Sequence, residues 1–347
     1  MTVERTTGRV TIQDVADAAG VSRAAVSKVI RDAYGVSPAM RERVLQTIDD
    51  MDYRPSVSAR GMRGATLTIG IEIPEFANQY FTMVIAGITE TLADSPYQLI
   101  IAPTERSSRE GYRAIQALAD RQVDGIIAVS PLVERDWLEK FARSTPTVML
   151  GRHDPARNYD TVIGDDVTGT RLVMEHLLGL GHRDIVHMAP GENVTSSGSG
   201  TPHSLRLGGY VDAMTEAGLR DGVRIIRSDN SEEGAYVATL ALLDERVPTA
   251  VFAGNDEPAL GVLRALVERG LHTSVSVVGY DDTGAAQHPL ISLTSVAQSG
   301  VEMGHRAAEL LLERFSGRTE PVHQVFAPRL VVRESSGPVG SVLRKNN

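Results

Sequence analysis

The stretch Val10-Thr-Ile-Gln-Asp-Val-Ala-Asp-Ala-Ala-Gly-Val-Ser-Arg-Ala-Ala-Val-Ser-Lys-Val-Ile30 contains two helix starts in quick succession. Thr11 can cap the first helix, and the side chain of Asp14 can accept the backbone N–H of Thr11 in return, which forms a capping box. Gly20 ends that helix, because only glycine enters a left-handed C-cap without steric cost. Ser22 can cap the second helix. Two short helices joined by a three-residue turn that contains glycine predict a helix-turn-helix.

A third helix is expected after Ser37, which can cap it, with Pro38 at a first position where a missing N–H costs nothing. Its apolar residues recur at helical spacing, namely Val44, Leu45, Ile48 and Met51. Three such helices can share one small core, which predicts an all-α headpiece over residues 10–53. The second helix is left with four outward-facing residues, Arg23, Ala24, Ser27 and Lys28.

This segment resembles the headpiece of the LacI/GalR (lactose-repressor-like) transcriptional regulators. The matching residues are Val10-Thr-Ile-x-Asp-Val-Ala-x-x-Ala-Gly-Val-Ser22, Val26-Ser-Lys-Val29, Val36-Ser37 and Tyr53-x-Pro55. The resemblance implies sequence-specific binding of double-stranded operator DNA, with Arg23, Ala24 and Lys28 on the main base-reading positions. Further expected DNA contacts are Thr11, Ser22, Ser27, Tyr34, Ser37 and Arg41, of which the last three are expected at phosphates. Lys28 departs from the arginine that is common at its position.

Residues 54–64 read Arg-Pro-Ser-Val-Ser-Ala-Arg-Gly-Met-Arg-Gly, which is too rich in glycine for a stable isolated helix. Composition alone favours a flexible tether. The family resemblance instead implies a hinge that becomes helical on operator DNA and enters the minor groove. It places Ala59 and Arg60 on groove-facing positions and Met62 where the family usually has a wedging leucine. Gly61 is a departure that raises the free energy of ordering by about 0.5–1 kcal/mol relative to alanine.

The chain has 347 residues, no cysteine and a net charge of -9. The missing cysteines exclude a disulfide framework and a zinc site built on Cys. No apolar run approaches the length of a membrane span, and the N-terminus lacks the apolar core of a signal peptide, so a cytoplasmic location is expected. Residues 1–64 carry a net charge of +2 and the remainder -11. DNA would repel an acidic body, which should therefore stay clear of the phosphates.

From Leu67 onward, short aliphatic runs alternate with amphipathic helices. The predicted strands are Thr68–Ile73, Gln98–Ala102, Gly125–Val129, Thr147–Leu150, Thr161–Gly164, Asp184–Met188, Arg224–Arg227, Ala250–Ala253 and Ser276–Gly279. The predicted helices start near Tyr80, Ser108, Glu134, Asp166, Leu205, Ser231, Asp256 and Gly300. This alternation predicts parallel sheets with helices on both faces, and two sheets rather than one very large sheet.

The resemblance extends over this region, where it implies an α/β core like that of periplasmic sugar-binding proteins. That fold consists of two Rossmann-like subdomains, joined by three strands, with a cleft between them. The implied core spans residues 65–335, with an N-subdomain of 65–164 and 296–323 and a C-subdomain of 165–295 and 324–335. Residues 1–9 are expected to be disordered, and 336–347 to form a flexible tail that lacks leucine heptads.

Catalytic motifs are missing from the sequence. It has no Gly-x-Gly-x-x-Gly after a strand, no Walker-type loop and no Gly-x-Ser-x-Gly elbow, so we expect neither an enzyme nor a cofactor. His176 and His182 lack metal-binding spacing, and His182 is best interpreted as a loop residue before a strand. Contiguous aspartates at 165–166 and 281–282 more often cap helices or bind sugar hydroxyls than hold a metal ion.

Ligands of open α/β sheets bind at the carboxyl ends of the strands, where this chain has a series of polar residues. Some of them lie in family-like motifs, such as Leu205-Arg-Leu-Gly-Gly-Tyr210 and Phe252-Ala-Gly-Asn-Asp256. The expected effector-binding residues are Asn78, Tyr80, Phe81, Arg152, Asp165, Arg206, Asn230, Asn255, Asp281 and Gln298. Any one of them could be a helix cap, but so many at successive strand ends favour a polyol site. Many sugar-binding relatives have an aromatic residue near position 230, where this chain has asparagine.

These features together predict a homodimeric repressor that binds operator DNA under the control of a sugar-like effector, with no membrane partner. A stand-alone solute-binding protein or a sugar-processing enzyme is the alternative. The headpiece and the missing signal peptide argue against the first, and the missing catalytic motifs argue against the second.

Overall fold

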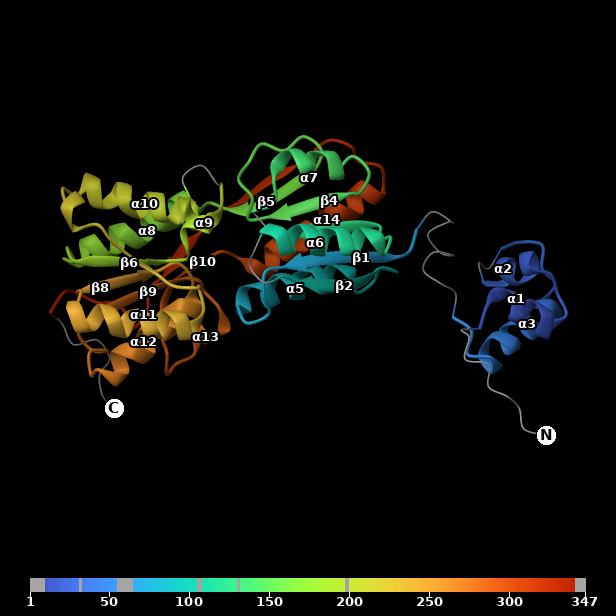
Figure 1. The fold of residues 1–347 in the computed structure, drawn as a ribbon, viewed down its shortest axis with the longest axis horizontal. Helices are drawn as coiled ribbons and strands as arrows, with labels where there is room; N and C mark the ends of the chain where they lie inside the picture. The colour runs from blue at the N-terminus through green and yellow to red at the C-terminus, as the bar shows by residue number, and fades with distance from the viewer. Residues whose placement is uncertain are drawn as a thin grey trace. The chain divides into compact units, whose positions relative to one another are not determined.

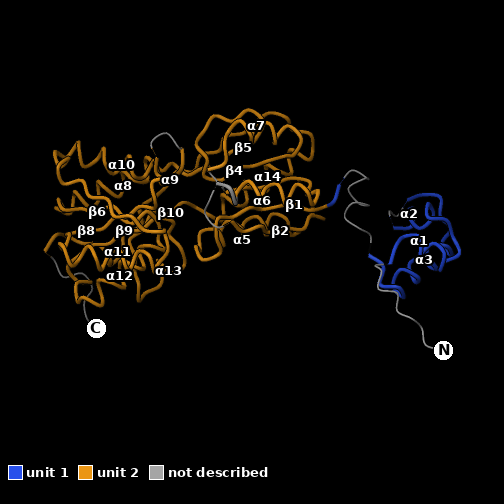
Figure 2. Tube along the Cα trace, in the orientation of Figure 1, with its two compact units in different colours: residues 1–66 blue, residues 67–347 orange. Residues whose placement is uncertain are grey.

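The computed structural model describes residues 10–30, 33–54, 65–104, 108–129, 132–196 and 200–340. The chain divides into two compact units, residues 1–66 and 67–347 (Figure 2). The expected disordered N-terminus and the expected hinge residues Ala59, Arg60 and Met62 lie outside the described residues.

The first unit contains the predicted helix-turn-helix. Its helices are α1 (Ile12–Ala19), α2 (Arg23–Ile30) and α3 (Pro38–Asp50). Thr11 and Asp14 form the capping box, in which the Asp14 carboxylate accepts the Thr11 backbone N–H at 2.7 Å. Gly20 adopts the left-handed conformation, with φ of 65°. These local signals therefore act as the sequence predicts.

The small core of this unit differs from the prediction at one position. Val44 is fully buried, and Ile48 and Met51 pack against the same cluster, whereas Leu45 is 49% exposed. Val44, Ile48 and Met51 follow one another at spacings of four and three residues, so Leu45 lies beside that stripe rather than on it. Tyr53 is buried and helps to close the core.

The second unit contains two six-stranded sheets (Figure 1). The first has the order β11-β5-β4-β3-β1-β2 and consists of β1 (Thr68–Ile73), β2 (Gln98–Pro103), β3 (Gly125–Ala128), β4 (Thr147–Leu150), β5 (Asp160–Gly164) and β11 (His323–Phe326). The second has the order β12-β10-β9-β8-β6-β7 and consists of β6 (Ile185–Ala189), β7 (Arg224–Arg227), β8 (Ala250–Ala253), β9 (Ser276–Asp281), β10 (Thr294–Ala297) and β12 (Arg329–Val331). All strand pairs are parallel except β10 with β12.

Helices cover both faces of each sheet, as predicted. The first sheet has α5 (Gln79–Leu92) and α14 (Gly300–Phe315) on one face, and α6 (Ser108–Asp120) and α7 (Arg135–Phe141) on the other. The second sheet has α11 (Glu232–Glu245) and α12 (Asp256–Glu268) on one face, and α8 (Asp166–Gly179) and α10 (Pro202–Glu216) on the other. Three short elements complete the unit: α9 (Glu192–Thr195), a 3-10 helix (Arg220–Gly222) and α13 (Gly284–Gln287).

The chain passes between the two sheets after β5, after β10 and after β11. The last passage falls later than the predicted boundary at 323/324, because β11 continues to Phe326 in parallel register with β5. The predicted flexible tail also begins too early. The carbonyl of Gly337 accepts a hydrogen bond from the Nε2 of His182 at 3.0 Å, and the N–H of Val339 donates to Leu180. His182 is therefore a buried structural residue that holds this segment.

Candidate functional site

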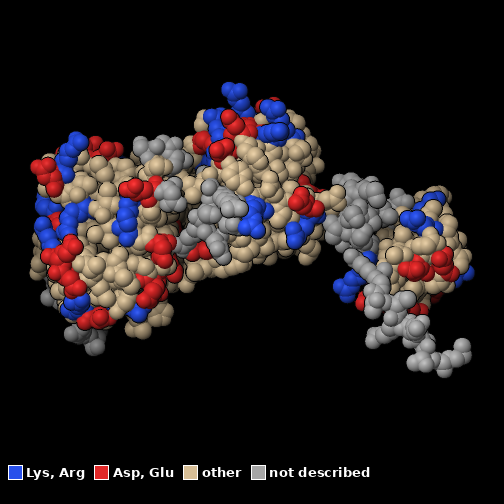
Figure 3. All heavy atoms as spheres, in the orientation of Figure 1, with Lys and Arg blue, Asp and Glu red and all other residues tan. Residues whose placement is uncertain are grey.

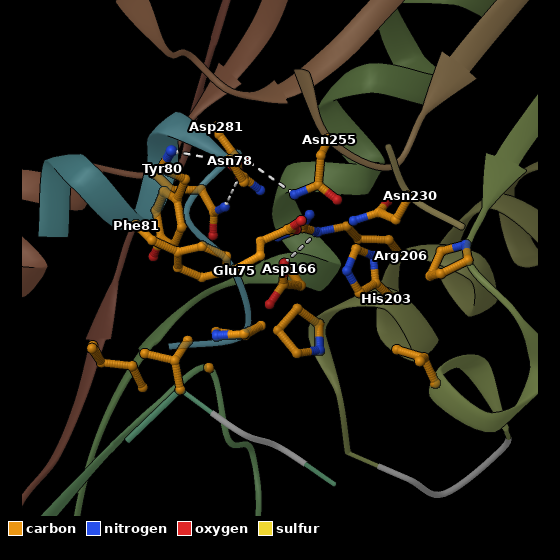
Figure 4. A pocket seen from close by; sticks show the side chains of 18 of the residues that line it. Glu75, Asn78, Tyr80, Phe81, Asp166, His203, Arg206, Asn230, Asn255 and Asp281 are labelled. Carbon is orange, nitrogen blue, oxygen red and sulfur yellow. Dashed lines mark hydrogen bonds and ion pairs between the residues drawn. The ribbon is translucent and has the colours of Figure 1, made fainter. Parts of the chain in front are cut away.

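A cavity of about 510 Å³ lies between the two sheets, at the carboxyl ends of their strands (Figure 4). Both sheets contribute to its walls, as the strand-end argument predicts. Eight of the ten expected effector-binding residues line it: Asn78, Tyr80, Phe81, Arg206, Asn230, Asn255, Asp281 and Gln298.

Arg152 and Asp165 are the two expected residues that do not line this cavity. The guanidinium of Arg152 turns instead to the carboxylate of Asp154, at 2.7 Å, and to the carbonyl of Val133. The carboxylate of Asp165 caps α8 by accepting the N–H of Thr168 at 2.9 Å. The expectation that ligand-binding residues follow strand ends does not take such local partners into account. These partners decide where both side chains point.

Arg206 is the buried cation of the cavity, and Asp166 is its partner. The Nε of Arg206 donates to Asp166 at 2.7 Å, its Nη1 donates to the carbonyl of Gly254 at 2.6 Å, and its guanidinium lies 3.6 Å above the ring of Tyr280. The other oxygen of Asp166 lies 2.9 Å from the Nε2 of His153. Burial opposes ionisation of Asp166, but Arg206 and His153 outweigh it and lower the pKa of the carboxyl below its usual value. The positive charge of Arg206 is thus already offset within the protein.

Asp166 lines the cavity, yet it was not predicted as a ligand residue. Its sequence signal was the contiguous pair at 165–166, for which both helix capping and the binding of sugar hydroxyls were left open. Asp165 caps α8, whereas Asp166 turns to Arg206, forty residues further along the chain.

Asp281 lies at the centre of a second polar network. Its two carboxylate oxygens accept hydrogen bonds from the side-chain amides of Asn255, at 2.9 Å, and Gln298. Burial raises the pKa of Asp281 to about 6. Burial and the nearby Asp281 charge also raise the pKa of Asp256 to about 7. Two carboxyl groups that would both ionise in water are therefore held close together away from solvent.

The backbone of Asp281 is strained. Its φ is 113°, a value that residues other than glycine rarely adopt. Such strain costs of order 1–3 kcal/mol and is concentrated at functional sites. Asn255, which donates to Asp281, is only 6% exposed, and its Oδ1 has no hydrogen-bond partner among the described residues. In Figure 4 this side chain extends toward the cavity. The wall of the cavity therefore contains one buried acceptor without a partner among the described residues.

The residues before and within α5 serve both the fold and the cavity. The Oδ1 of Asn78 caps α5 by accepting the N–H of Tyr80 at 2.9 Å, and the hydroxyl of Tyr80 lies 3.3 Å from the sulfur of Met303. The rings of Tyr80 and Phe81 pack edge to face, with centroids 5.7 Å apart. Five further polar lining residues were not predicted: Glu75, Thr104, His203, Ser228 and Asp229. All but His203 lie in the loops that follow β1, β2 and β7, so their position after strand ends could have identified them.

The first unit exposes the expected base-reading residues Arg23, Ala24 and Lys28 on α2. Tyr34 is fully exposed in the loop before α3, and Ser27 and Arg41 are half-buried. The three other expected DNA contacts are capping residues: Thr11 caps α1, Ser22 accepts the N–H of Ala25 at 3.2 Å, and Ser37 caps α3.

Charges elsewhere are mixed. Figure 3 shows Lys and Arg interspersed with Asp and Glu over the visible face of the second unit. None of the helices in the described ranges is long and apolar enough to cross a membrane. In those same ranges, no group of three or more His, Cys, Asp or Glu residues could hold a metal ion.

A helix-turn-helix unit followed by a two-sheet unit with a ligand-sized cavity defines the class of ligand-responsive DNA-binding regulators. The chain belongs to the LacI family within this class. The family model for bacterial regulatory proteins of the lacI family matches residues 11–56, and the model for the periplasmic binding protein-like domain matches residues 174–336.

Similar proteins match along most of their length. The chain is 32% identical over 342 residues to the HTH-type transcriptional regulator DegA of Bacillus subtilis (strain 168), which covers 96% of this chain and 100% of DegA. A solved complex of the transcriptional regulator CelR with cellobiose is 32% identical, with a TM-score of 0.67 over 94% of this chain and 100% of that one. The lac repressor dimer bound to operator and the anti-inducer ONPF is 29% identical, with a TM-score of 0.75 over 95% of this chain and 100% of that one. This chain is accordingly a LacI-family transcriptional regulator.

Proposed function

We propose that this protein is a homodimeric repressor that binds a near-palindromic operator in the cytoplasm and changes its affinity for DNA when a sugar or related polyol occupies the cavity. The observation that carries the proposal is the convergence of eight polar or aromatic side chains on one cavity at the carboxyl ends of the strands, in a chain that also carries a helix-turn-helix. The similar CelR was solved with cellobiose, which supports an effector of this kind.

The DNA-binding part of the proposal assigns separate tasks to residues of the first unit. Arg23 and Lys28 are exposed on α2 and can form hydrogen bonds with guanine, whereas Arg41 lies on α3 and is assigned to a phosphate. Two headpieces of a two-fold dimer would contact two half-sites. Because Thr11, Ser22 and Ser37 already cap helices, their hydroxyls position the backbone, and the charged residues supply most of the specificity.

Arg23→Ala should weaken binding to the best operator by about 1–3 kcal/mol and relax specificity at a single base pair, since a base contact discriminates among sequences. Arg41→Ala should weaken binding to all duplexes alike, because phosphates carry no sequence information. Gel-shift titrations on operator variants at fixed salt measure both effects. An equal loss on every duplex for Arg23→Ala would contradict the assignment.

Effector control would pass through residues 54–64. A ligand that closes the cavity would shift the core and change whether the two hinges can pair, a coupling with reciprocal effects on DNA and ligand affinity. Deleting residues 56–63 tests this part of the proposal, which would be abandoned if operator affinity and its response to sugars both survived.

The alternative functions are a stand-alone solute-binding protein and a sugar-processing enzyme. A gel shift of the full-length chain on DNA upstream of its own gene, with and without sugars, distinguishes them from a repressor. A retarded band that changes with one sugar supports the repressor. No preference for any palindromic duplex over random sequence would overturn the proposal.

A further inference from the structure

A loop of the first sheet contacts the part of the chain that covers the second sheet. We call each sheet with its helices a lobe. The loop follows β4, and its residue His153 contacts two segments of the second lobe. The backbone N–H of His153 donates to the carbonyl of Gly200 at 3.4 Å, and the side-chain Nε2 lies 2.9 Å from the carboxylate of Asp166 at the start of α8. Asp166 directly follows the passage of the chain after β5, so the loop joins the lobes beside a point about which they can turn.

The contact between His153 and Asp166 is a hydrogen bond with a defined direction. Burial opposes ionisation of Asp166, but Arg206 and His153 outweigh burial and hold the pKa of the carboxyl below its usual value. An ionised carboxylate only accepts hydrogen bonds, so the Nε2 of His153 carries the proton and donates. The second oxygen of Asp166 accepts the Nε of Arg206 at 2.7 Å. One buried carboxylate therefore binds a donor from each lobe.

Little water competes for this hydrogen bond. The side chains of His153 and Asp166 are 15% and 1% exposed. Hydrogen bonds to an ionised acceptor are about twice as strong as those between neutral groups. The lobes also pack closely here, because a Cβ atom on Gly151 would lie 3.3 Å from the Cγ of Pro202 in the second lobe. Separation of the lobes at this loop would break the hydrogen bond and open the packed contact.

The loop is also held within its own lobe by residues other than His153. The guanidinium of Arg152 lies 2.7 Å from the carboxylate of Asp154 and donates to the carbonyl of Val133. The hydroxyl of Tyr159 donates to Asp154 at 2.9 Å. We therefore expect the loop to keep its shape when the side chain of His153 is removed. The loss would then fall on the contact between the lobes.

We propose that His153 is a positioning residue that latches the two lobes together through its hydrogen bond to Asp166. Both partners are protein side chains, so the bond needs no effector and favours the closed arrangement before any ligand binds. Loss of the bond should shift the population toward arrangements in which the lobes are further apart. This inference goes beyond the proposed function, because it does not depend on which ligand the cavity binds.

The distance between the lobes can be measured on the full-length chain. The sequence has no cysteine, so Lys140→Cys on α7 and Asp212→Cys on α10 introduce two unique sites for spin labels. Both residues are exposed, and their helices belong to different lobes (Figure 1). Double electron-electron resonance then reports the distance between the lobes without any ligand. Labelled chain is diluted with unlabelled chain, so that distances between two protomers do not contribute.

Three variants of the labelled chain test the latch. His153→Ala should shift the distance distribution to longer values. His153→Gln places an amide nitrogen near the position of Nε2 and should restore the original distribution, because it can still donate to Asp166. His305→Ala is the matched control: His305 lies 2.8 Å from the carboxylate of Glu90, but both residues belong to the first lobe. This variant should leave the distribution unchanged.

Several results would overturn the latch. One is an unchanged distribution for His153→Ala. Another is an equal shift for His153→Gln, which would assign the effect to packing rather than to the hydrogen bond. An equal shift for His305→Ala would show a general loosening of the chain. Loss of the far-ultraviolet circular dichroism of His153→Ala would also overturn it, because the residue would then be required for the fold. The proposed repressor function is tested separately by the gel shifts and stands or falls with them.

Discussion

Arg206 and Asp166 form a charged pair in a place where single charges are not tolerated. Their side chains are 3% and 1% exposed, and they join α10 to the start of α8 beside the cavity. A buried pair adds little net stability, because each charge loses its hydration, but removal of one partner leaves the other charge buried and uncompensated. Loss of either residue is therefore expected to destabilise the fold whether or not a ligand is bound.

Asp166→Ala should lower the free energy of unfolding by about 3–5 kcal/mol, because it leaves the guanidinium of Arg206 without its carboxylate. Urea unfolding followed by the fluorescence of Trp137, the only tryptophan of the chain, measures the loss.

Arg171→Ala is the matched control on the same helix, since its partner Glu175 is an exposed neighbour and both side chains are 58% exposed. It should cost no more than about 0.5 kcal/mol. Similar small losses for both variants would mean that the buried pair does not depend on both partners.

At the scale of elements, the helix pair α5 and α14 contributes three side chains to the cavity wall. Tyr80 and Phe81 lie near the start of α5, and Met303 lies on α14. The two helices approach backbone to backbone at Gly87. A Cβ atom there would lie 2.0 Å from the carbonyl oxygen of Val301. Only glycine permits this approach, because the opposing atoms belong to the backbone and cannot rotate away.

Gly87→Ala should therefore lower the free energy of unfolding by about 1–3 kcal/mol through overpacking, even though alanine favours a helix more than glycine does. Chemical denaturation of the full-length chain measures the change. Gly208→Ala on α10 is the control, because a Cβ atom there meets no atom within 4 Å, and it should raise the free energy of unfolding by about 0.5–1 kcal/mol. Effects of the same sign would show that the helix crossing can yield.

At the scale of the whole molecule, each of the two units has a core of its own. The core of the first unit is small, with Val15, Val26 and Val44 fully buried, whereas the second unit has four larger clusters around two sheets. Small domains bury a smaller fraction of their surface and are less stable than large ones. The headpiece is consequently expected to be the first unit to unfold.

The full-length chain should unfold in urea in two stages, which violates the two-state approximation. Far-ultraviolet circular dichroism should detect both stages, whereas Trp137 fluorescence should report only the second, because Trp137 lies in the second unit. Val26→Asp places a charge in the headpiece core and should remove the first stage without moving the fluorescence midpoint. Coincident transitions for both probes would show instead that the two units unfold as one.

The short-range features of this chain could be predicted from the sequence by itself. The capping box of Thr11 and Asp14 and the left-handed Gly20 depend only on residues within a turn of each other, so the helix-turn-helix follows directly. Four of the nine predicted strands have the predicted bounds: Thr68–Ile73, Thr147–Leu150, Arg224–Arg227 and Ala250–Ala253. Three of them are buried strands, whose apolar runs have sharp ends, whereas Arg224–Arg227 is a partly exposed edge strand.

The remaining features were decided by tertiary structure, because they depend on partners far away in the chain. Strands β10, β11 and β12 were missed: they have at most four residues, and two of them are partly exposed edge strands defined by their pairing. The strand-end rule located eight lining residues, but it could not show that Arg152 turns to Asp154 or that Asp166 pairs with Arg206. A residue's type limits which bonds it can form, whereas only the packed fold selects the neighbour that receives them.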